Sequence, residues 1–129
     1  MDEKFIIDTN ILIYYLDGSI PNKQLTKLEK IFVDSFNIST ITKIELLGWQ
    51  KIDKTTISKI ELFIRNAKIY YLDFHTENKT IELKQKYKIA IPDTIIAATA
   101  LINKFTLVTR NQTDFRKIKN LKIYNPYEK

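Results

Sequence analysis

The chain has 129 residues, a formal net charge of +6 and no cysteine, and 44% of its residues are hydrophobic. That length fits a single domain spanning residues 1–129, and the apolar fraction is enough for a substantial core. The lack of cysteine excludes a disulfide scaffold, thiolate zinc ligands and a cysteine nucleophile, and it fits a reducing compartment.

The positive charge is compatible with two interpretations. It would attract a polyanionic partner, most simply nucleic acid. It would also follow from the lysine-rich composition that A·T-rich codons produce, so both interpretations stay open. The N-terminal stretch lacks the features of a signal peptide, and the longest apolar run, at 89–102, is interrupted and shorter than the roughly 20 residues of a membrane span. We therefore expect a cytoplasmic protein without a membrane segment.

In the first half of the chain, short apolar runs alternate with amphipathic segments. The run KFII suits a buried strand, and the apolar stretch after it is typical of a helix that Gly18 and Pro21 end. Asp53 stands where an N-cap is expected, ahead of apolar residues at helical spacing. The expected elements are a strand at 4–7, helices at 10–17 and 22–34, a strand at 36–39, a helix at 40–51, and a helix after Asp53 with Ile57, Ile60, Ile64 and Ala67 on one face.

The second half continues the alternation. Pro92 marks the start of a helix, because proline is favoured in the first turn, and the nearly continuous apolar character of that helix predicts a central, buried position. The expected elements are a strand at 68–73, a helix at 76–89, the helix that begins near Pro92 and runs to 104, a strand at 106–109, a helical turn at 114–118 and a strand at 121–125.

Strands that alternate with helices predict an α/β domain with a mainly parallel sheet. In such sheets, ligands bind outside the carboxyl ends of the strands. Asp8 directly follows the first strand, and Asp114 lies in the loop that leaves the strand at 106–109. Both carboxylates should therefore open into one crevice, provided that the two strands are parallel neighbours.

Each of three aspartates has a structural explanation as well as a chemical one. Asp8 is placed to cap the helix after it, Asp93 lies in a first turn where the macrodipole favours an anion, and Asp114 is placed to cap a short turn. Converging carboxylates repel one another, so a divalent cation would explain all of them together. Oxygen ligands without cysteine suit Mg²⁺ or Mn²⁺.

The position of Glu45 depends on where its helix begins. If Thr42 is the N-cap, Glu45 completes a capping box and has a structural role. If the helix begins at Ser39 or Thr40, Glu45 lies more than a turn inside it, among apolar residues where an unpaired carboxylate is costly. We favour the earlier start, because residues 37–39 have the character of a strand that turns directly into a helix.

Other chemistries are poorly supported. His75 is the single histidine, which excludes catalysis by two imidazoles and histidine-rich zinc sites within one chain. There is no nucleophile elbow for a serine triad, and two glycines cannot form a phosphate-binding loop. The pairs Tyr14–Tyr15 and Tyr70–Tyr71 are compatible with base stacking or with an alternation between core and surface.

Four blocks occur in order along nearly the whole chain: FIIDTNILIYYLDG, STITKIELLGW, YKIAIPDTIIAATAL and LVTRNQTDF. Together they resemble the PIN-domain superfamily and, within it, the VapC-type toxins of bacterial toxin–antitoxin pairs. The resemblance implies a three-layer α/β/α sandwich around a parallel sheet. It also implies an endoribonuclease that uses one or two Mg²⁺ or Mn²⁺ ions, a cognate antitoxin and a homodimer.

The resemblance also implies roles for individual residues. The metal-binding acids are then Asp8, Glu45, Asp93 and Asp114. The supporting polar residues are Asn10, Thr109 and Asn111. Arg110 and the lysines would hold the RNA backbone, although Arg110 is equally interpretable as a plain surface residue. Many PIN domains carry a further acid before the last aspartate, and the stretch RNQT here has none, which weakens the case for a fully occupied second metal site.

Two other functions remain open at the level of sequence. A PIN-like RNA-binding module that has lost catalysis would keep the fold, although the four acids argue against it. A housekeeping RNA-processing nuclease, or one directed at DNA, would keep the chemistry but not the toxin role.

Overall fold

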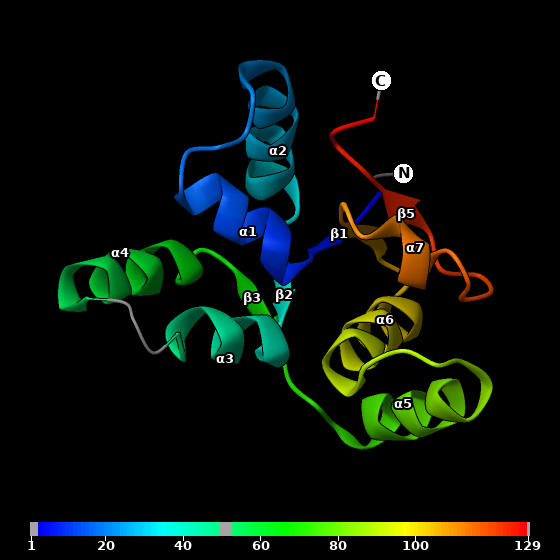
Figure 1. Cartoon of the computed structure of the whole chain (residues 1–129). Helices are drawn as coiled ribbons and strands as arrows, with labels where there is room; N and C mark the ends of the chain where they lie inside the picture. Colours follow the sequence, from blue (N-terminus) through cyan, green and yellow to red (C-terminus); the bar gives the residue numbers. More distant parts are fainter. Residues whose placement is uncertain (1–2, 50–52, 129) are drawn as a thin grey trace.

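The computed structural model describes residues 3–49 and 53–128 (Figure 1). Five short strands alternate with seven helices along these residues. The elements are β1 (Phe5–Ile7), α1 (Thr9–Leu16), α2 (Asn22–Asp34), β2 (Asn37–Ser39), α3 (Thr40–Leu47), α4 (Lys54–Ile64), β3 (Lys68–Tyr70), α5 (Phe74–Lys86), α6 (Ile91–Asn103), β4 (Thr106–Val108), α7 (Gln112–Phe115) and β5 (Ile123–Tyr124).

Side-chain caps explain where four of the helices begin. Asp8 Oδ1 accepts a hydrogen bond from the Thr9 amide at 2.9 Å, at the start of α1. Ser39, Asp53 and Asp73 accept bonds from amides in the first turns of α3, α4 and α5, respectively. Each cap satisfies a backbone N–H that has no partner within its helix.

Some elements differ in length from the expectation. The helix expected at 40–51 ends at Leu47, where the Gly48 N–H returns to the Ile44 carbonyl at 2.7 Å, and residues 50–52 lie outside the described part of the chain. The strand expected at 68–73 ends at Tyr70, because the chain turns to place Asp73 as the N-cap of α5. That cap also starts α5 two residues earlier than apolar spacing indicates.

All strand pairs are parallel. One ladder joins β1, β4 and β5 in the order β1-β4-β5, and a second joins β2 to β3. β2 lies beside β1, but no backbone ladder pairs them in the described residues. Side chains bridge this seam instead: the Phe5 N–H donates to Ser35 Oγ at 3.1 Å, and Asn37 Nδ2 donates to the Phe5 carbonyl at 2.7 Å.

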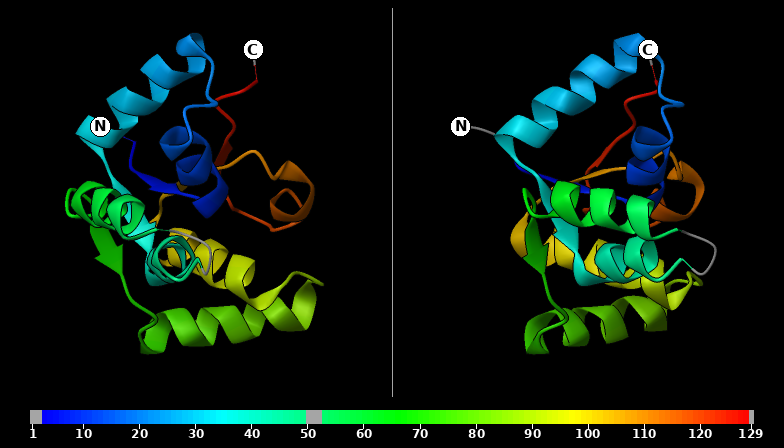
Figure 2. Two further views of the ribbon diagram at one scale, coloured as in Figure 1. Left: turned by 60° about the vertical axis from the view of Figure 1, so that its left-hand side comes forward. Right: turned by 90° about the vertical axis from the view of Figure 1, so that its left-hand side faces the viewer.

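The sheet buries both of its faces. Ile7 and Val108 pack with residues of α1, α2 and α4, whereas Ile6 and Leu107 pack with residues of α5 and α6. This alternation follows from the two-residue period of a strand. Figure 2 shows α1 and α2 on one side of the strands and α5 and α6 on the other. The expected three-layer α/β/α sandwich around a parallel sheet is confirmed.

The helix α6 is the most deeply buried, as its sequence indicates. Every residue from Thr94 to Ala100 is buried, and the helix ends at Asn103, followed by the C-cap Lys104, whose backbone is left-handed with φ of 58°. Among the described residues, no helix is long and apolar enough to cross a membrane.

Candidate active site

The carboxyl ends of β1 and β4 lie side by side and place Asp8 next to Thr109. The Asp8 N–H donates to the Val108 carbonyl at 3.0 Å, which continues the ladder beyond the strand. The Thr109 hydroxyl donates to Asp8 Oδ2 at 2.7 Å, and its oxygen accepts the Asn111 N–H at 2.9 Å. Both oxygens of the Asp8 carboxylate are therefore held, one by Thr109 and the other by the Thr9 amide.

A second set of hydrogen bonds joins α1 to α3. The Thr9 hydroxyl donates to Glu45 Oε1 at 2.7 Å, and its oxygen lies 2.9 Å from that of Thr42. Ser39 caps α3, so the favoured early start of this helix is confirmed and a capping box at Thr42 is excluded. Glu45 is exposed rather than enclosed by apolar side chains, and its carboxylate accepts the Thr9 hydroxyl of α1.

Asp93 lies in the first turn of α6 and is partly buried. Asp114 lies inside α7, so it does not cap the turn as an N-cap would, and its carboxylate is 3.9 Å from Lys117 Nζ. Asp93 and Asp114 therefore both lie in the first turn of a helix, where a carboxylate interacts favourably with the helix dipole.

The electrostatics show which acids lie close together. Burial raises the pKa of Asp8 from 3.8 to about 6, with further increases from the negative charges of Asp93 and Glu45, while the Thr109 and Thr9 hydrogen bonds oppose the rise. Burial also raises the pKa of Asp93, and the charges of Glu45 and Asp114 add to this increase. Asp8, Glu45 and Asp93 thus form one interacting group, which we call the acidic cluster, and Asp114 interacts with it through Asp93.

The expected supporting residues have different positions. Asn10 is exposed, and the hydrogen bonds to the Asp8 carboxylate come from Thr9 and Thr109. Asn111 is held by its backbone N–H at the start of α7. The Arg110 guanidinium lies 4.1 Å from the ring centroid of Tyr127 and 5.3 Å from that of Tyr14. Arg110 is exposed, and the two rings hold its guanidinium in place. It directly follows Thr109, whose hydroxyl donates to Asp8.

The aromatic pairs divide between core and surface. Tyr15 packs against Phe32 and Phe63, and Tyr70 packs edge-on against Phe105. Tyr71 is 62% exposed. Of the residues near the acidic cluster, sequence reasoning missed Thr9, Thr42 and Tyr127. The only sequence signal for Thr9 is its place between Asp8 and Asn10 in the block DTN.

The donors at this edge suit a hard divalent cation. They are carboxylate and hydroxyl oxygens. Burial is the main cause of the raised pKa of Asp8, the charges of Asp93 and Glu45 add to it, and a bound cation would offset both effects by favouring the ionised carboxylate. In residues 3–49 and 53–128, no three such acids converge closely enough to enclose an ion by themselves. The residues therefore fit an open site, in which Mg²⁺ typically keeps water and phosphate oxygens as its remaining ligands.

The fold and the site together define a class of protein: an α/β fold with acids gathered at the carboxyl edge of a parallel sheet. Residues 5–121 match the family described as "PIN domain". "Ribonuclease VapC2" of Rickettsia felis is 31% identical over 131 aligned residues, which cover 94% of this chain and 96% of that protein. The chain belongs to the PIN-domain family, in its VapC branch.

Solved structures agree with this assignment. A chain of a toxin–antitoxin complex from Klebsiella pneumoniae has a TM-score of 0.76 and 27% identity, with 97% of this chain and 99% of that chain covered. A chain of VapBC2 from Rickettsia felis, bound to a DNA fragment from its promoter, also has a TM-score of 0.76, with 28% identity and coverage of 94% and 97%.

Proposed function

We propose that this chain is a Mg²⁺- or Mn²⁺-dependent endoribonuclease and the toxin of a type II toxin–antitoxin pair. The observation that supports this most is the acidic cluster, in which Asp8 is fixed by two hydrogen bonds and lies near enough to Glu45 and Asp93 for their charges to raise its pKa. The name of the Rickettsia felis relative, a ribonuclease, agrees with that chemistry.

Asp8, Glu45, Asp93 and Asp114 would hold one or two metal ions. A bound ion of this kind lowers the pKa of a water molecule and neutralises charge that develops on a phosphate. The chain's own residues supply orientation. Thr109 fixes one oxygen of Asp8, and the Thr9 hydroxyl fixes one oxygen of Glu45.

Arg110 contributes substrate binding in this proposal. Its guanidinium is exposed, follows Thr109 directly, and is held over two tyrosine rings. A planar, fixed guanidinium suits a phosphate oxygen pair. It would hold the RNA backbone beside the acidic cluster.

The central test replaces Asp8 and Asp93 separately with asparagine. Because each change removes a charge that the ion needs, we expect cleavage of single-stranded RNA in Mn²⁺ to fall by about a hundredfold or more. Glu61→Gln is the control, because it also removes one negative charge, but from an exposed position on α4. Circular dichroism would verify folding. Cleavage that resists EDTA, or that persists in both aspartate variants, would contradict the mechanism.

The wider role rests on the relatives. We propose that the chain is one PIN domain, works in the cytoplasm as a homodimer, and is inhibited by an antitoxin that places a segment over the acidic cluster. Growth after induction, with and without a short reading frame adjoining the gene, tests the toxin role. If growth is unaffected while RNA is cleaved, an RNA-processing nuclease is the better description; if RNA binds uncut in Mn²⁺, a binding module is.

A further inference from the structure

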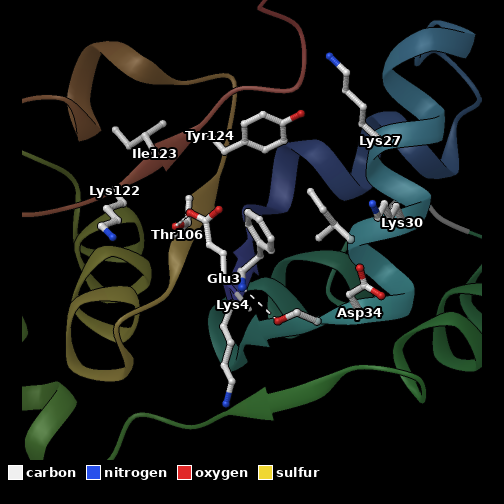
Figure 3. Close-up of a pocket in the computed structure, with 12 residues that line it drawn as sticks. Glu3, Lys4, Lys27, Lys30, Asp34, Thr106, Lys122, Ile123 and Tyr124 are labelled. Carbon is white, nitrogen blue, oxygen red and sulfur yellow. Dashed lines mark hydrogen bonds between the residues drawn. The ribbon is translucent and has the colours of Figure 1, made fainter. Parts of the chain in front are cut away.

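A large open pocket lies at the end of the sheet opposite the acidic cluster. It has a volume of about 1120 Å³ and is lined by the residues that begin the central strands, such as Phe5 and Thr106. Figure 3 shows α2, which carries Lys27 and Lys30, along one side of it, and the segment with Lys122 along the other. We call it the amino-end pocket.

Four lysines line the amino-end pocket: Lys4, Lys27, Lys30 and Lys122. All four are exposed, and none takes part in the ion pairs found between described residues. Two acids, Glu3 and Asp34, also line the pocket, so its four lysines outnumber its acids by two. The pocket therefore carries an excess of positive charge.

The inner wall of the pocket is apolar and aromatic. Phe5 and Tyr124 lie there with ring centroids 6.2 Å apart, next to Ile31 of α2. A groove that combines lysines with aromatic rings has the composition of a surface for single-stranded nucleic acid, because the lysines follow the backbone and the rings contact bases. A duplex would not offer bases to such a wall.

We propose that the amino-end pocket binds the backbone of single-stranded RNA at a distance from the bond that is cut. The proposal rests on the proposed function in one respect, that RNA is the substrate. Lys4 and Asp8 are four residues apart along β1, which corresponds to about 13 Å in a parallel strand. An RNA that reaches both ends of the sheet must therefore be longer than one that reaches the acidic cluster alone.

The test compares two double variants of the full chain. Lys27→Gln with Lys30→Gln removes two charges from the pocket, and Lys54→Gln with Lys59→Gln removes two from α4. Binding of a 24-nucleotide and of a 3-nucleotide single-stranded RNA would be measured by fluorescence anisotropy in EDTA, over a range of salt. Cleavage of both RNAs would be measured in Mn²⁺.

We expect the pocket variant to bind the 24-nucleotide RNA roughly tenfold more weakly. The slope of log K against log salt concentration should also be shallower by about 1.4, because each of the two lost phosphate contacts to a single strand contributes about 0.7 to that slope. Its cleavage of the 3-nucleotide RNA, which is too short to reach both ends of the sheet, should match that of the unmodified chain. An equal loss in the α4 variant, or equal losses for both RNAs, would overturn the proposal. So would tighter binding of duplex DNA or polyglutamate at the pocket.

Failure of the two proposals would look different. If the unmodified chain cuts no RNA yet binds the 24-nucleotide RNA through Lys27 and Lys30, the nuclease function is wrong and the pocket assignment stands. If the chain cuts RNA normally and the pocket variant binds and cuts both RNAs unchanged, the pocket assignment is wrong and the nuclease function stands.

Discussion

Asp8 has a structural and an electrostatic role at the same time. Its Oδ1 caps α1, and its Oδ2 accepts the Thr109 hydroxyl, so the carboxylate is fixed in both directions. Burial nevertheless raises its pKa to about 6, which means that the ionised form is disfavoured in the folded chain. The cap and ligand interpretations of this residue are therefore compatible, because the cap uses only one of its two oxygens.

That pKa predicts how stability changes with pH when metal is removed by EDTA. Between pH 3.8 and about 6, the folded state holds a proton on Asp8 that the unfolded state has lost. The contribution of Asp8 to the free energy of unfolding should therefore fall as pH rises through this range, by roughly 3 kcal/mol, since each pKa unit corresponds to about 1.4 kcal/mol. Urea unfolding of the unmodified chain and of Asp8→Asn at several pH values measures the difference.

Asp53 provides the control of opposite sign. The Thr56 hydrogen bonds lower the pKa of Asp53, so its contribution to stability is present above the unfolded pKa and is lost as pH falls. Asp53→Asn should remove a contribution that grows with pH, whereas Asp8→Asn should remove one that shrinks. A pH dependence that is the same with and without Asp8 would contradict the raised pKa.

At the scale of elements, the sheet consists of two ladders joined by side chains. Asn37 is buried, and its amide donates both to the Phe5 carbonyl at 2.7 Å and to Ser35 Oγ at 2.9 Å. These bonds satisfy groups that a continuous ladder would pair through the backbone. A single side chain thus links β2 to β1.

Replacement of Asn37 by alanine should therefore be costly. Removing its amide leaves the partly buried Phe5 carbonyl without that partner, which corresponds to about 1–3 kcal/mol of unfolding free energy. Chemical denaturation measures this loss. Asn78→Ala, on the exposed surface of α5, should change stability by less than about 0.5 kcal/mol. Equal effects of the two changes would show that the side-chain bridge contributes nothing to the seam.

The sequence determined most elements but not the contacts between them. The strand-to-acid junction at Asp8 is visible in the sequence because an apolar run ends there, and parallel strands bring their carboxyl ends together. The bond between Thr9 and Glu45 could not be predicted, because it joins residues 36 positions apart and depends on how α1 and α3 pack. The early start of α5 at Phe74 was not predicted, because its N-cap Asp73 follows a stretch of β-forming residues that indicated a strand.

At the scale of the whole molecule, negative charge gathers at the carboxyl end of the sheet, and lysines gather at the amino end. The acidic cluster lies on one edge, and the amino-end pocket lies on the other. The net charge of +6 is thus a sum over regions of opposite sign. A cation and a polyanion would be attracted to different ends of the same sheet.

Binding of a cation at the acidic edge should stabilise the entire fold. A ligand that binds only the folded state adds about 3 kcal/mol at a concentration 100 times its Kd. We therefore expect Mn²⁺ to raise the Tm by several degrees, more at pH 7 than at pH 5, because protons compete for Asp8. Differential scanning calorimetry measures the shift. Asp93→Asn should reduce it and Glu61→Gln should not; an equal rise in all three proteins would indicate binding elsewhere.

The side-chain seam has a consequence for the spacing of the acids. Asp8 follows β1, which belongs to one ladder, and Glu45 lies on α3, which follows β2 of the other. A few hydrogen bonds, those of Phe5 with Ser35 and Asn37 and that of Thr9 with Glu45, therefore set the gap between the two carboxylates. In a continuous sheet, the backbone would fix this gap. Here the distance between the Asp8 and Glu45 carboxylates depends on a few side chains, so a substitution at one position of the seam should change it.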